Sequence, residues 1–506
     1  MEILSELISL DVLIALLVGT IGGMVIGALP GLSANMGVAL LLPVTYGMEP
    51  ISALVMLAAT YTSAIFGGSF TAILIHTPGT PSSASTARDG YEMTLQGRGL
   101  EAIGLSTVSS VFGGVFSAVM LLLIAPPLAR MALNFSAPEN FWIAIFGLTI
   151  IGSLAGGDLL KGFISGAFGL ILSAIGLEQS TATMRYTFGI IELQAGIPLI
   201  PTMIGLFSIS QIMIQAERIS KGEGMGKGQI TTDGIKFGKK FFPTFKEYMG
   251  HLVNLIRSAV LGLLIGILPG AGGDIGCWVG YNEAKRFSKH PEKFGHGSEE
   301  GVVASETANN AVTGGSFIPL FALGIPGSGT AAIMLGAMTI HGLTPGMQLF
   351  TRNTNIIYPI IIGFLVANIL MGIIGWVVAK QAVKITNIPM NILTPLIVVL
   401  ALVGAYAINF RMFDLTLMLI FGIIGYFMRK FNFPTAPIVL ALILGPMAEN
   451  SLYSITGMAR NQNLLIYFLG RPICVVFIVL AILAIFAPIF MKRVRKEKVE
   501  TLSEDD

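Results

Sequence analysis

Long apolar stretches recur along the whole sequence, and polar residues fall mostly between them. A helix that crosses the hydrocarbon core of a bilayer needs about 20 mostly apolar residues. The stretches do not alternate apolar and polar residues, as the strands of a membrane β-barrel do. The pattern therefore predicts an all-α polytopic membrane protein with about 12 transmembrane helices. The apolar stretches are residues 12–29, 51–75, 102–129, 141–155, 159–177, 197–214, 252–268, 356–379, 392–409, 413–428, 435–447 and 466–491.

Composition and charge agree with a membrane location. Of the 506 residues, 54% are hydrophobic and 11% are charged, whereas about 25% of a soluble domain is charged. Segment 216–250 has seven basic residues and segment 492–498 has five, so the positive-inside rule predicts that both face the cytoplasm. The N-terminal MEILSELISLD has three acids and no Lys or Arg. We expect it to lie outside and, because it lacks the basic region of a signal peptide, to be retained.

Cysteine and histidine content does not indicate a cofactor or a metal centre. Cys277 and Cys474 are the only cysteines, and both lie in apolar sequence, which suggests neither a disulfide framework nor a metal site. The five histidines show no ligand spacing such as H-E-x-x-H. We expect no cofactor, no resident metal and no nucleic-acid partner.

The sequence contains an internal repeat. GGMVIGALPG at 22–31 matches LGLLIGILPG at 261–270, and FGGSFTAILIHTPGT at 66–80 matches TGGSFIPLFALGIPGSGT at 313–330. In both halves a Pro-Gly pair comes first, a GGSF motif follows, and a second Pro-Gly pair comes about ten residues later. Two matched motifs at a similar offset indicate that the chain arose by duplication.

The distribution of charge orients the two halves. With the N-terminus outside and the basic loop inside, the first half crosses the membrane an odd number of times, so the second half is inverted. Inverted repeats are common in secondary transporters. A cytoplasmic tail then requires one extra helix. The predicted organisation is a first transmembrane repeat at 1–215, a basic cytoplasmic loop at 216–250, a second transmembrane repeat at 251–455, a C-terminal transmembrane helix at 456–491 and a cytoplasmic tail at 492–506.

Four Pro-Gly pairs interrupt the apolar stretches, two in each half. Proline lacks a backbone donor and glycine leaves a helix easily, so each pair frees polar backbone groups. In a membrane these groups are tolerated only where protein buries them or a watery cavity accepts them. Hydroxyl and amide side chains follow the pairs, which favours binding sites at discontinuous or re-entrant hairpins over plain proline kinks. The predicted substrate-binding residues are Pro30, Gly31, Asn35, Pro78, Gly79, Thr80, Ser82, Ser83, Pro326, Gly327, Ser328 and Thr330.

Ionisable and amide residues beside the breaks are candidates for binding a coupling ion. Asp274 follows the third break and Glu306 precedes the fourth, and carboxylates inside a membrane are usually functional. Asp274 could instead be a helix N-cap. Asn309 and Asn310 could instead join neighbouring helices. The predicted coupling-ion residues are Asn35, Gly270, Asp274, Glu306, Asn309 and Asn310.

Other classes of protein fit the sequence less well. AGGD at 271–274 is not the G-x-G-D of an intramembrane protease, and PGSG at 326–329 is not G-x-S-G, so we expect no enzyme. A channel would need a repeated filter or rings of charge. The repeat has two units and its breaks lack such rings. A channel, or a secondary transporter for another kind of substrate, remains the alternative.

Several long motifs resemble the large membrane subunit of the tripartite tricarboxylate transporters. They are GALPGLSANMGVALLLPVTYGMEP at 27–50, FGGSFTAILIHTPGTPSSASTARDGYEM at 66–93, the stretch at 266–346 that contains GILPGAGGDIGCWVGYNEAKRF and FALGIPGSGTAAIMLGAM, and FNFPTAPIVLALILGPMAENSLYSI at 431–455. The chain departs from the family pattern at Glu92 and Met347, where proline is usual.

The resemblance implies a multi-pass permease of the bacterial cell inner membrane, driven by a Na+ or H+ gradient. It further implies two partners, a small membrane subunit and a periplasmic substrate-binding protein. The expected substrate is an organic carboxylate such as citrate, another tricarboxylate or a dicarboxylate. Alternating access would expose the substrate site at the Pro-Gly hairpin tips to each side in turn.

Overall fold

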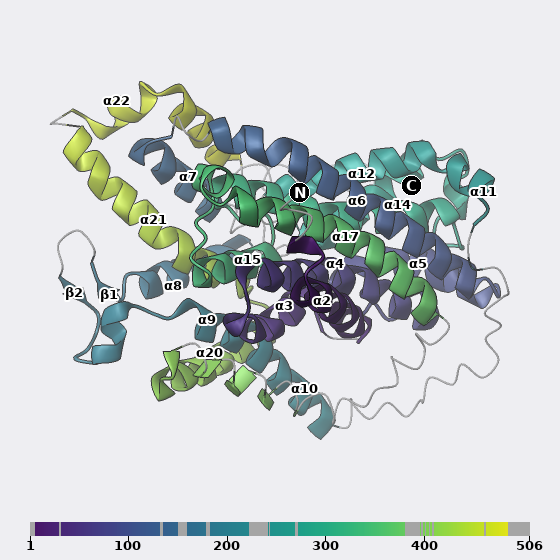
Figure 1. Ribbon diagram of the computed structural model, residues 1–506, viewed down its shortest axis with the longest axis horizontal. Helices are drawn as coiled ribbons and strands as arrows, with labels where there is room; N and C mark the ends of the chain where they lie inside the picture. The colour runs from purple at the N-terminus through teal and green to yellow at the C-terminus, as the bar shows by residue number, and fades with distance from the viewer. Residues whose placement is uncertain are drawn as a thin grey trace, which may run out of the picture. The chain divides into compact units, whose positions relative to one another are not determined.

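The computed structural model of the chain is composed mainly of helices (Figure 1). The predictions for Pro30, Gly31 and Gly270, for the tail at 492–506 and for most of the loop at 216–250 lie outside the residues that the structure describes. The described residues are 6–29, 32–131, 135–149, 159–178, 183–221, 241, 243–268, 272–379, 395, 398–399, 401–403, 405–406, 409–459 and 462–483.

The chain divides into two compact units, and each is built from segments distant in the sequence. The first unit comprises Met1–Ala132 and Met203–Tyr426, so it draws on both predicted repeats. Its helices are α2 (Leu10–Ala28), α3 (Ala34–Leu41), η1 (Pro43–Gly47), α4 (Pro50–Ile75), η2 (Pro81–Ser83), α5 (Ala84–Leu95), α6 (Gly99–Met131), the π-helix η6 (Ile204–Ile209), α10 (Ser210–Ser220), α11 (Phe245–Gly250), α12 (Leu252–Ile267), α13 (Gly272–Phe287), η7 (Pro291–Lys293), α14 (Glu299–Leu323), α15 (Gly329–Ile340), α16 (Met347–Thr351), α17 (Thr354–Val378) and the start of α20 (Met412–Lys430).

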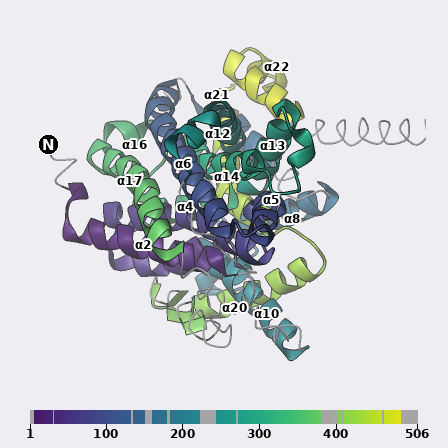
Figure 2. The same cartoon turned by 90° about the vertical axis from the view of Figure 1, so that its right-hand side faces the viewer.

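Glycines hold α2 and α4 in backbone contact. A Cβ atom built on Gly23 would lie 2.5 Å from the Thr60 carbonyl oxygen, and one on Gly27 would lie 2.0 Å from that of Ala64. Both distances are too short for any side chain. Small residues in membrane helices allow such close approach. The two helices lie side by side in both views (Figures 1 and 2).

The second half repeats this contact between α12 and α14. A Cβ atom on Gly262 would lie 2.2 Å from the Ala308 carbonyl oxygen, and one on Gly266 would lie 2.6 Å from that of Val312. Gly262 is therefore the counterpart of Gly23, which lies 239 positions before it (262 − 23). Ala308 is the counterpart of Thr60, which lies 248 positions before it (308 − 60).

These contacts also set which residues of α4 and α14 are equivalent. Gly67 packs on Met24, and Gly315 packs on Leu263 in the same manner. Gly315 of α14 lies 248 positions after Gly67 of α4 (315 − 67). The matching serines of the two GGSF motifs are only 247 positions apart (316 − 69). The packing is therefore displaced by one residue from the letter match, and it makes Tyr61 the counterpart of Asn309.

The helix that follows each hairpin packs on the other half. α6 belongs to the first half by sequence but packs along α14, and α17 belongs to the second half but packs on α4. Figure 2 shows α6 beside α14. Gly113 of α6 makes this contact close, because its Cβ would lie 2.2 Å from the Thr307 carbonyl oxygen. The two halves are thus interleaved within the first unit.

The second unit comprises Leu133–Thr202 and Phe427–Asp506, and its described helices gather around α21. α21 packs on α7 and α8, and a short antiparallel hairpin, β1 with β2, follows α8. Its elements are α7 (Ala137–Thr149), α8 (Leu159–Ser173), β1 (Gly176–Leu177), β2 (Met184–Arg185), η5 (Ile191–Ala195), the start of α9 (Leu199–Met203), α21 (Ala436–Met458) and α22 (Leu464–Leu469).

The helices confirm an all-α membrane protein. Among the described residues, six helices are long and apolar enough to cross a bilayer, and six shorter helical stretches are also apolar. The predicted helices at 159–177 and 466–491 differ from the structure. The first ends at Ser173 before β1. The second is divided between α22 and Pro472–Leu483, since proline is favoured in the first turn of a new helix. The total of about 12 stays a prediction.

Candidate functional site

The first of two hairpin tips, residues 78–83, folds back on its own half. α4 ends where His76 adopts a left-handed conformation, and the chain then turns through Pro78 and Gly79. The Gly79 N–H donates to the Gly68 carbonyl at 3.2 Å. A Cβ atom on Gly79 would lie 2.0 Å from the Gly27 carbonyl oxygen. Only glycine fits here, so the first tip is held against both α2 and α4 by its backbone.

The second tip, residues 326–330, makes the same contacts in the other half. The Gly327 N–H points to the Ser316 carbonyl of α14 at 3.4 Å. A Cβ atom on Gly327 would lie 2.3 Å from the Gly266 carbonyl oxygen of α12. Ser328 then caps α15 by accepting a hydrogen bond from the Ala331 N–H at 3.1 Å. The Pro-Gly pairs of both tips are therefore held in place by backbone packing.

Each tip meets the start of a helix from the opposite half. The second tip lies against α3, where the Thr330 hydroxyl donates to the Asn35 side-chain oxygen. The first tip lies against α13, where the Ser82 hydroxyl faces the Asp274 carboxylate. Asp274 is exposed, whereas Ser82 is buried. Asp274 is the third residue of α13, so it is not the N-cap of that helix. The structure thus brings together four predicted site residues in two equivalent pairs.

Tyr61 and Asn309 occupy equivalent places behind the two tips. The Tyr61 hydroxyl lies 3.2 Å from the Ser328 hydroxyl and 3.5 Å from that of Ser316. Asn309 is wholly buried, and neither of its polar side-chain atoms has a hydrogen-bond partner among the described residues. The hydroxyl of Thr80 in the first tip is also buried there without a partner.

Glu306 makes hydrogen bonds to hydroxyl groups of two other helices. It is wholly buried in α14 and accepts hydrogen bonds from the Thr86 hydroxyl of α5 and, at 2.9 Å, from the Ser110 hydroxyl of α6. No charged partner of Glu306 lies among its described contacts. Its carboxyl group is therefore surrounded by neutral hydroxyls.

Asn310 connects helices rather than facing a tip. Its Nδ2 donates to the Glu306 carbonyl at 3.2 Å, and its Oδ1 accepts from the Thr62 hydroxyl of α4 at 3.5 Å. Thr62 also lies 2.6 Å from Oδ1 of Asn368 in α17. These contacts fit the alternative of an interhelical role for Asn310. The roles of Pro30, Gly31 and Gly270 stay predictions.

The sequence did not single out Tyr61 and Asp89, which make contacts important to the tips. Tyr61 lies in an apolar run with nothing to distinguish it from a packing residue. Asp89 follows the first tip on α5 and is wholly buried. Its Oδ1 accepts hydrogen bonds from the backbone N–H groups of Gly295 at 2.7 Å, Gly297 at 3.0 Å and Ser298 at 2.8 Å. The sequence could have indicated Asp89, because its D-G pair lies within the motif at 66–93.

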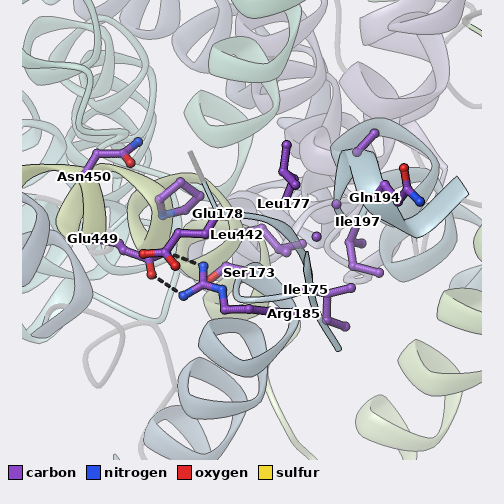
Figure 3. Close-up of a pocket in the computed structure, with 14 residues that line it drawn as sticks. Ser173, Ile175, Leu177, Glu178, Arg185, Gln194, Ile197, Leu442, Glu449 and Asn450 are labelled. Atoms are coloured by element: carbon purple, nitrogen blue, oxygen red, sulfur yellow. Dashed lines mark hydrogen bonds and ion pairs between the residues drawn. The ribbon is translucent and has the colours of Figure 1, made fainter. Parts of the chain in front are cut away.

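A polar pocket of about 180 Å³ in the second unit is a weaker candidate for a carboxylate site (Figure 3). Its lining includes Arg185, Glu178 and Glu449. The Arg185 guanidinium bonds to both carboxylate oxygens of Glu449, as the dashed lines of Figure 3 show. A carboxylate ligand would have to displace that pairing beside a second acidic residue. The second tip offers neutral donors, and the first turn of α3, which it meets, contains no acid.

The fold and the tips together define a multi-pass, all-α membrane protein with discontinuous helices and buried polar groups between its two halves. Residues 13–440 match the model of the tripartite tricarboxylate transporter TctA family. The chain belongs to this family, which is a class of transporters and not of enzymes. The tripartite family implies a small membrane subunit and a periplasmic binding protein as partners.

Two relatives from Agrobacterium vitis are similar to the chain. An uncharacterised 52.8 kDa protein in the TAR-I ttuC' 3' region is 34% identical over 489 residues, which cover 97% of this chain and 95% of the relative. An uncharacterised protein in the TAR-II ttuC' 3' region is 34% identical over 245 residues, which cover 48% of this chain and 100% of the relative. No solved structure matches the chain.

Proposed function

We propose that this protein is the large permease subunit of a binding-protein-dependent tripartite system in the bacterial inner membrane. It takes up an organic carboxylate by symport, driven by a Na+ or H+ gradient. The observation that carries the proposal is the pair of backbone-packed tips, each of which meets the start of a helix from the opposite half. Discontinuous helices of this kind hold substrates and ions in secondary transporters.

The substrate site consists of the two tips and the breaks that face them. N–H groups and hydroxyls would bind the carboxylate without a buried Arg, so the substrate can be released on the other side. The substrate-binding residues of this proposal are Pro30, Gly31, Asn35, Pro78, Gly79, Thr80, Ser82, Ser83, Pro326, Gly327, Ser328 and Thr330. The coupling-ion residues are drawn from Asn35, Gly270, Asp274, Glu306, Asn309 and Asn310.

Transport proceeds by alternating access between two inverted repeats. The recurrence of the same glycine contacts in α2–α4 and α12–α14 supports the duplication. Its inversion rests on the charge distribution, which places the N-terminus outside and the basic loop inside. Movement of the tip-bearing elements against the other helices would then expose the site to each side in turn.

Uptake by the reconstituted system tests this function. The permease, its small subunit and its binding protein are placed in liposomes, and uptake of labelled citrate and other carboxylates is followed under an imposed Na+ gradient or H+ gradient. Accumulation above the outside concentration is expected under one of the gradients. Non-saturable flux without accumulation would instead indicate a channel, and failure of every carboxylate with folded protein would overturn the substrate class.

A further inference from the structure

The two tips are equivalent in backbone packing but differ in the side chains behind them. Tyr61 and Asn309 occupy corresponding positions on α4 and α14, as the glycine contacts of those helices establish. The phenol of Tyr61 reaches the second tip and contacts Ser328. Asparagine lacks the ring, and among the described residues neither the Asn309 amide nor the Thr80 hydroxyl of the first tip has a hydrogen-bond partner. The first tip therefore has unused polar atoms where the second has a hydrogen bond.

The buried amide of Asn309 lies close to Ser82 of the first tip, beside the start of α13. A Cβ atom built on Gly273 would lie 2.9 Å from Oδ1 of Asn309 and 3.4 Å from the hydroxyl oxygen of Ser82. The Asp274 carboxylate follows next in the chain and faces the same Ser82 hydroxyl. A buried amide without a partner costs about 1–3 kcal/mol, so a ligand that satisfies it is favoured.

The charge at the two helix starts also differs. The N-terminal end of a helix carries about half a positive charge. In α13 the Asp274 carboxylate in the first turn outweighs this charge, so the region is net negative. In α3 the corresponding side chain is the neutral Asn35, and the first turn contains no acid. The start of α3 therefore favours an anion, and the start of α13 favours a cation.

We infer that the first tip binds a hard monovalent metal cation, with Asp274, Asn309 and Ser82 as its oxygen ligands. Carboxylate, amide and hydroxyl oxygens are the ligands that hard cations take. The second tip, with Ser328, Thr330 and Asn35, then binds the anionic group of the substrate, which narrows the proposed substrate site from both tips to this one. Glu306 and Asn310 lie in other contacts and are not part of this cation site.

Charge provides the coupling between the two tips, and this step rests on the proposed function. Asp274 is close enough to Tyr61 for its charge to act on the phenol that contacts the second tip. Without a cation, that negative charge opposes an anion at the second tip. A bound cation neutralises Asp274, so cation binding precedes and strengthens substrate binding.

Thermal unfolding of the purified permease measures cation binding without any substrate. The unfolding midpoint is recorded in NaCl and in choline chloride of equal ionic strength, because a ligand that binds only the folded state raises the midpoint. We expect Na+ to stabilise the wild type. Asp274→Asn and Asn309→Ala should weaken the apparent Na+ affinity by about tenfold or more, the usual effect of removing a charge-assisted contact. Asn35→Ala, at the position equivalent to Asp274, should keep the Na+ response.

Substrate binding by the same variants separates this inference from the proposed function. Citrate binding to wild type should rise with Na+, and Asp274→Asn should bind citrate equally with and without Na+. A full Na+ response in Asp274→Asn, or a wild type that responds to pH but not to Na+, would overturn the cation site. A Na+ response that is lost in the variants, together with no binding of any carboxylate, would leave the cation site standing and overturn the proposed substrate class. Size-exclusion profiles and Ser82→Ala, a smaller change, guard against misfolding.

Discussion

At the scale of single residues, two glycines and one tyrosine decide the form of the tips. Gly79 and Gly327 have no room for a Cβ atom, because carbonyl oxygens of α2 and α12 would lie 2.0 Å and 2.3 Å from it. Their role is therefore steric and is independent of the substrate. Tyr61 acts through its hydroxyl, which links α4 to the second tip.

The double variant Gly79→Leu with Gly327→Leu is expected to abolish carboxylate uptake while the protein still inserts into the membrane. The leucines force both tips away from the glycine-lined helices, but the apolar spans are unchanged. Liposome uptake and membrane fractionation measure the two effects. Gly47→Ala is the matched control, since no atom lies within 4 Å of its added Cβ. Near-normal uptake by the double variant would contradict the site assignment.

Tyr61→Phe removes one hydroxyl and leaves the aromatic packing in place. The net value of such a hydrogen bond is about 0.5–1.5 kcal/mol, so substrate affinity at the second tip should fall by roughly two- to tenfold. The response of the unfolding midpoint to Na+ should stay as in wild type. A loss of the Na+ response in this variant would show that the two tips do not divide the ligands as inferred.

At the scale of elements, Asp89 joins α5 to the loop before α14. One carboxylate oxygen accepts three backbone N–H groups from residues 295–298, so the first tip and the start of α14 are held through α5. Any displacement of the first tip along α5 would strain this connection.

Asp89→Asn should lower the free energy of unfolding by about 1.5–3 kcal/mol, the range for hydrogen bonds to a charged group. Thermal unfolding gives the change in stability, and limited proteolysis reports on the loop at 290–298. Glu92→Gln makes the same acid-to-amide change on α5, three residues further on, without such contacts. Equal effects of the two substitutions would contradict the role of Asp89.

The sequence predicted the kinds of element better than their partners. Apolar length identified α2, α4 and α17, but it missed α14 (Glu299–Leu323), which lies in none of the predicted apolar stretches. The Pro-Gly pairs located the two tips that the structure describes. The exact equivalence of α4 and α14 was not accessible, because the GGSF letters match one residue away from the packing register. Nor could spacing show that Asn310 contacts Thr62 while its neighbour Asn309 has no partner, since adjacent helical residues face different helices.

At the scale of the molecule, neither half of the first unit contains all of its own packing partners. α6 packs on α14 and α17 packs on α4, so each half supplies a helix that the other buries. The tips follow the same rule, with the first against α13 and the second against α3. Folding of one half should therefore depend on the presence of the other.

Splitting the chain within the basic loop tests this dependence. Fragments 1–230 and 231–506 should associate when they are co-expressed, and an affinity tag on either fragment should recover both from detergent. Each fragment alone should be degraded, because α4 would lack α17 and α14 would lack α6. Stable accumulation of one fragment alone would contradict the interleaved packing.

The crosswise contact of tips and helix starts has a consequence for ancestry. A protein of half this length could not form these contacts within one copy, but two copies related by a twofold axis could. Both tips of such a dimer would be identical, so a change that suits one ligand would appear at both. Fusion into a single chain removes that constraint. It allows one position to hold Tyr61 and its counterpart Asn309, and one helix start to hold Asn35 and its counterpart Asp274. After fusion, a substitution in one half changes one tip alone, so the two tips can come to bind different ligands.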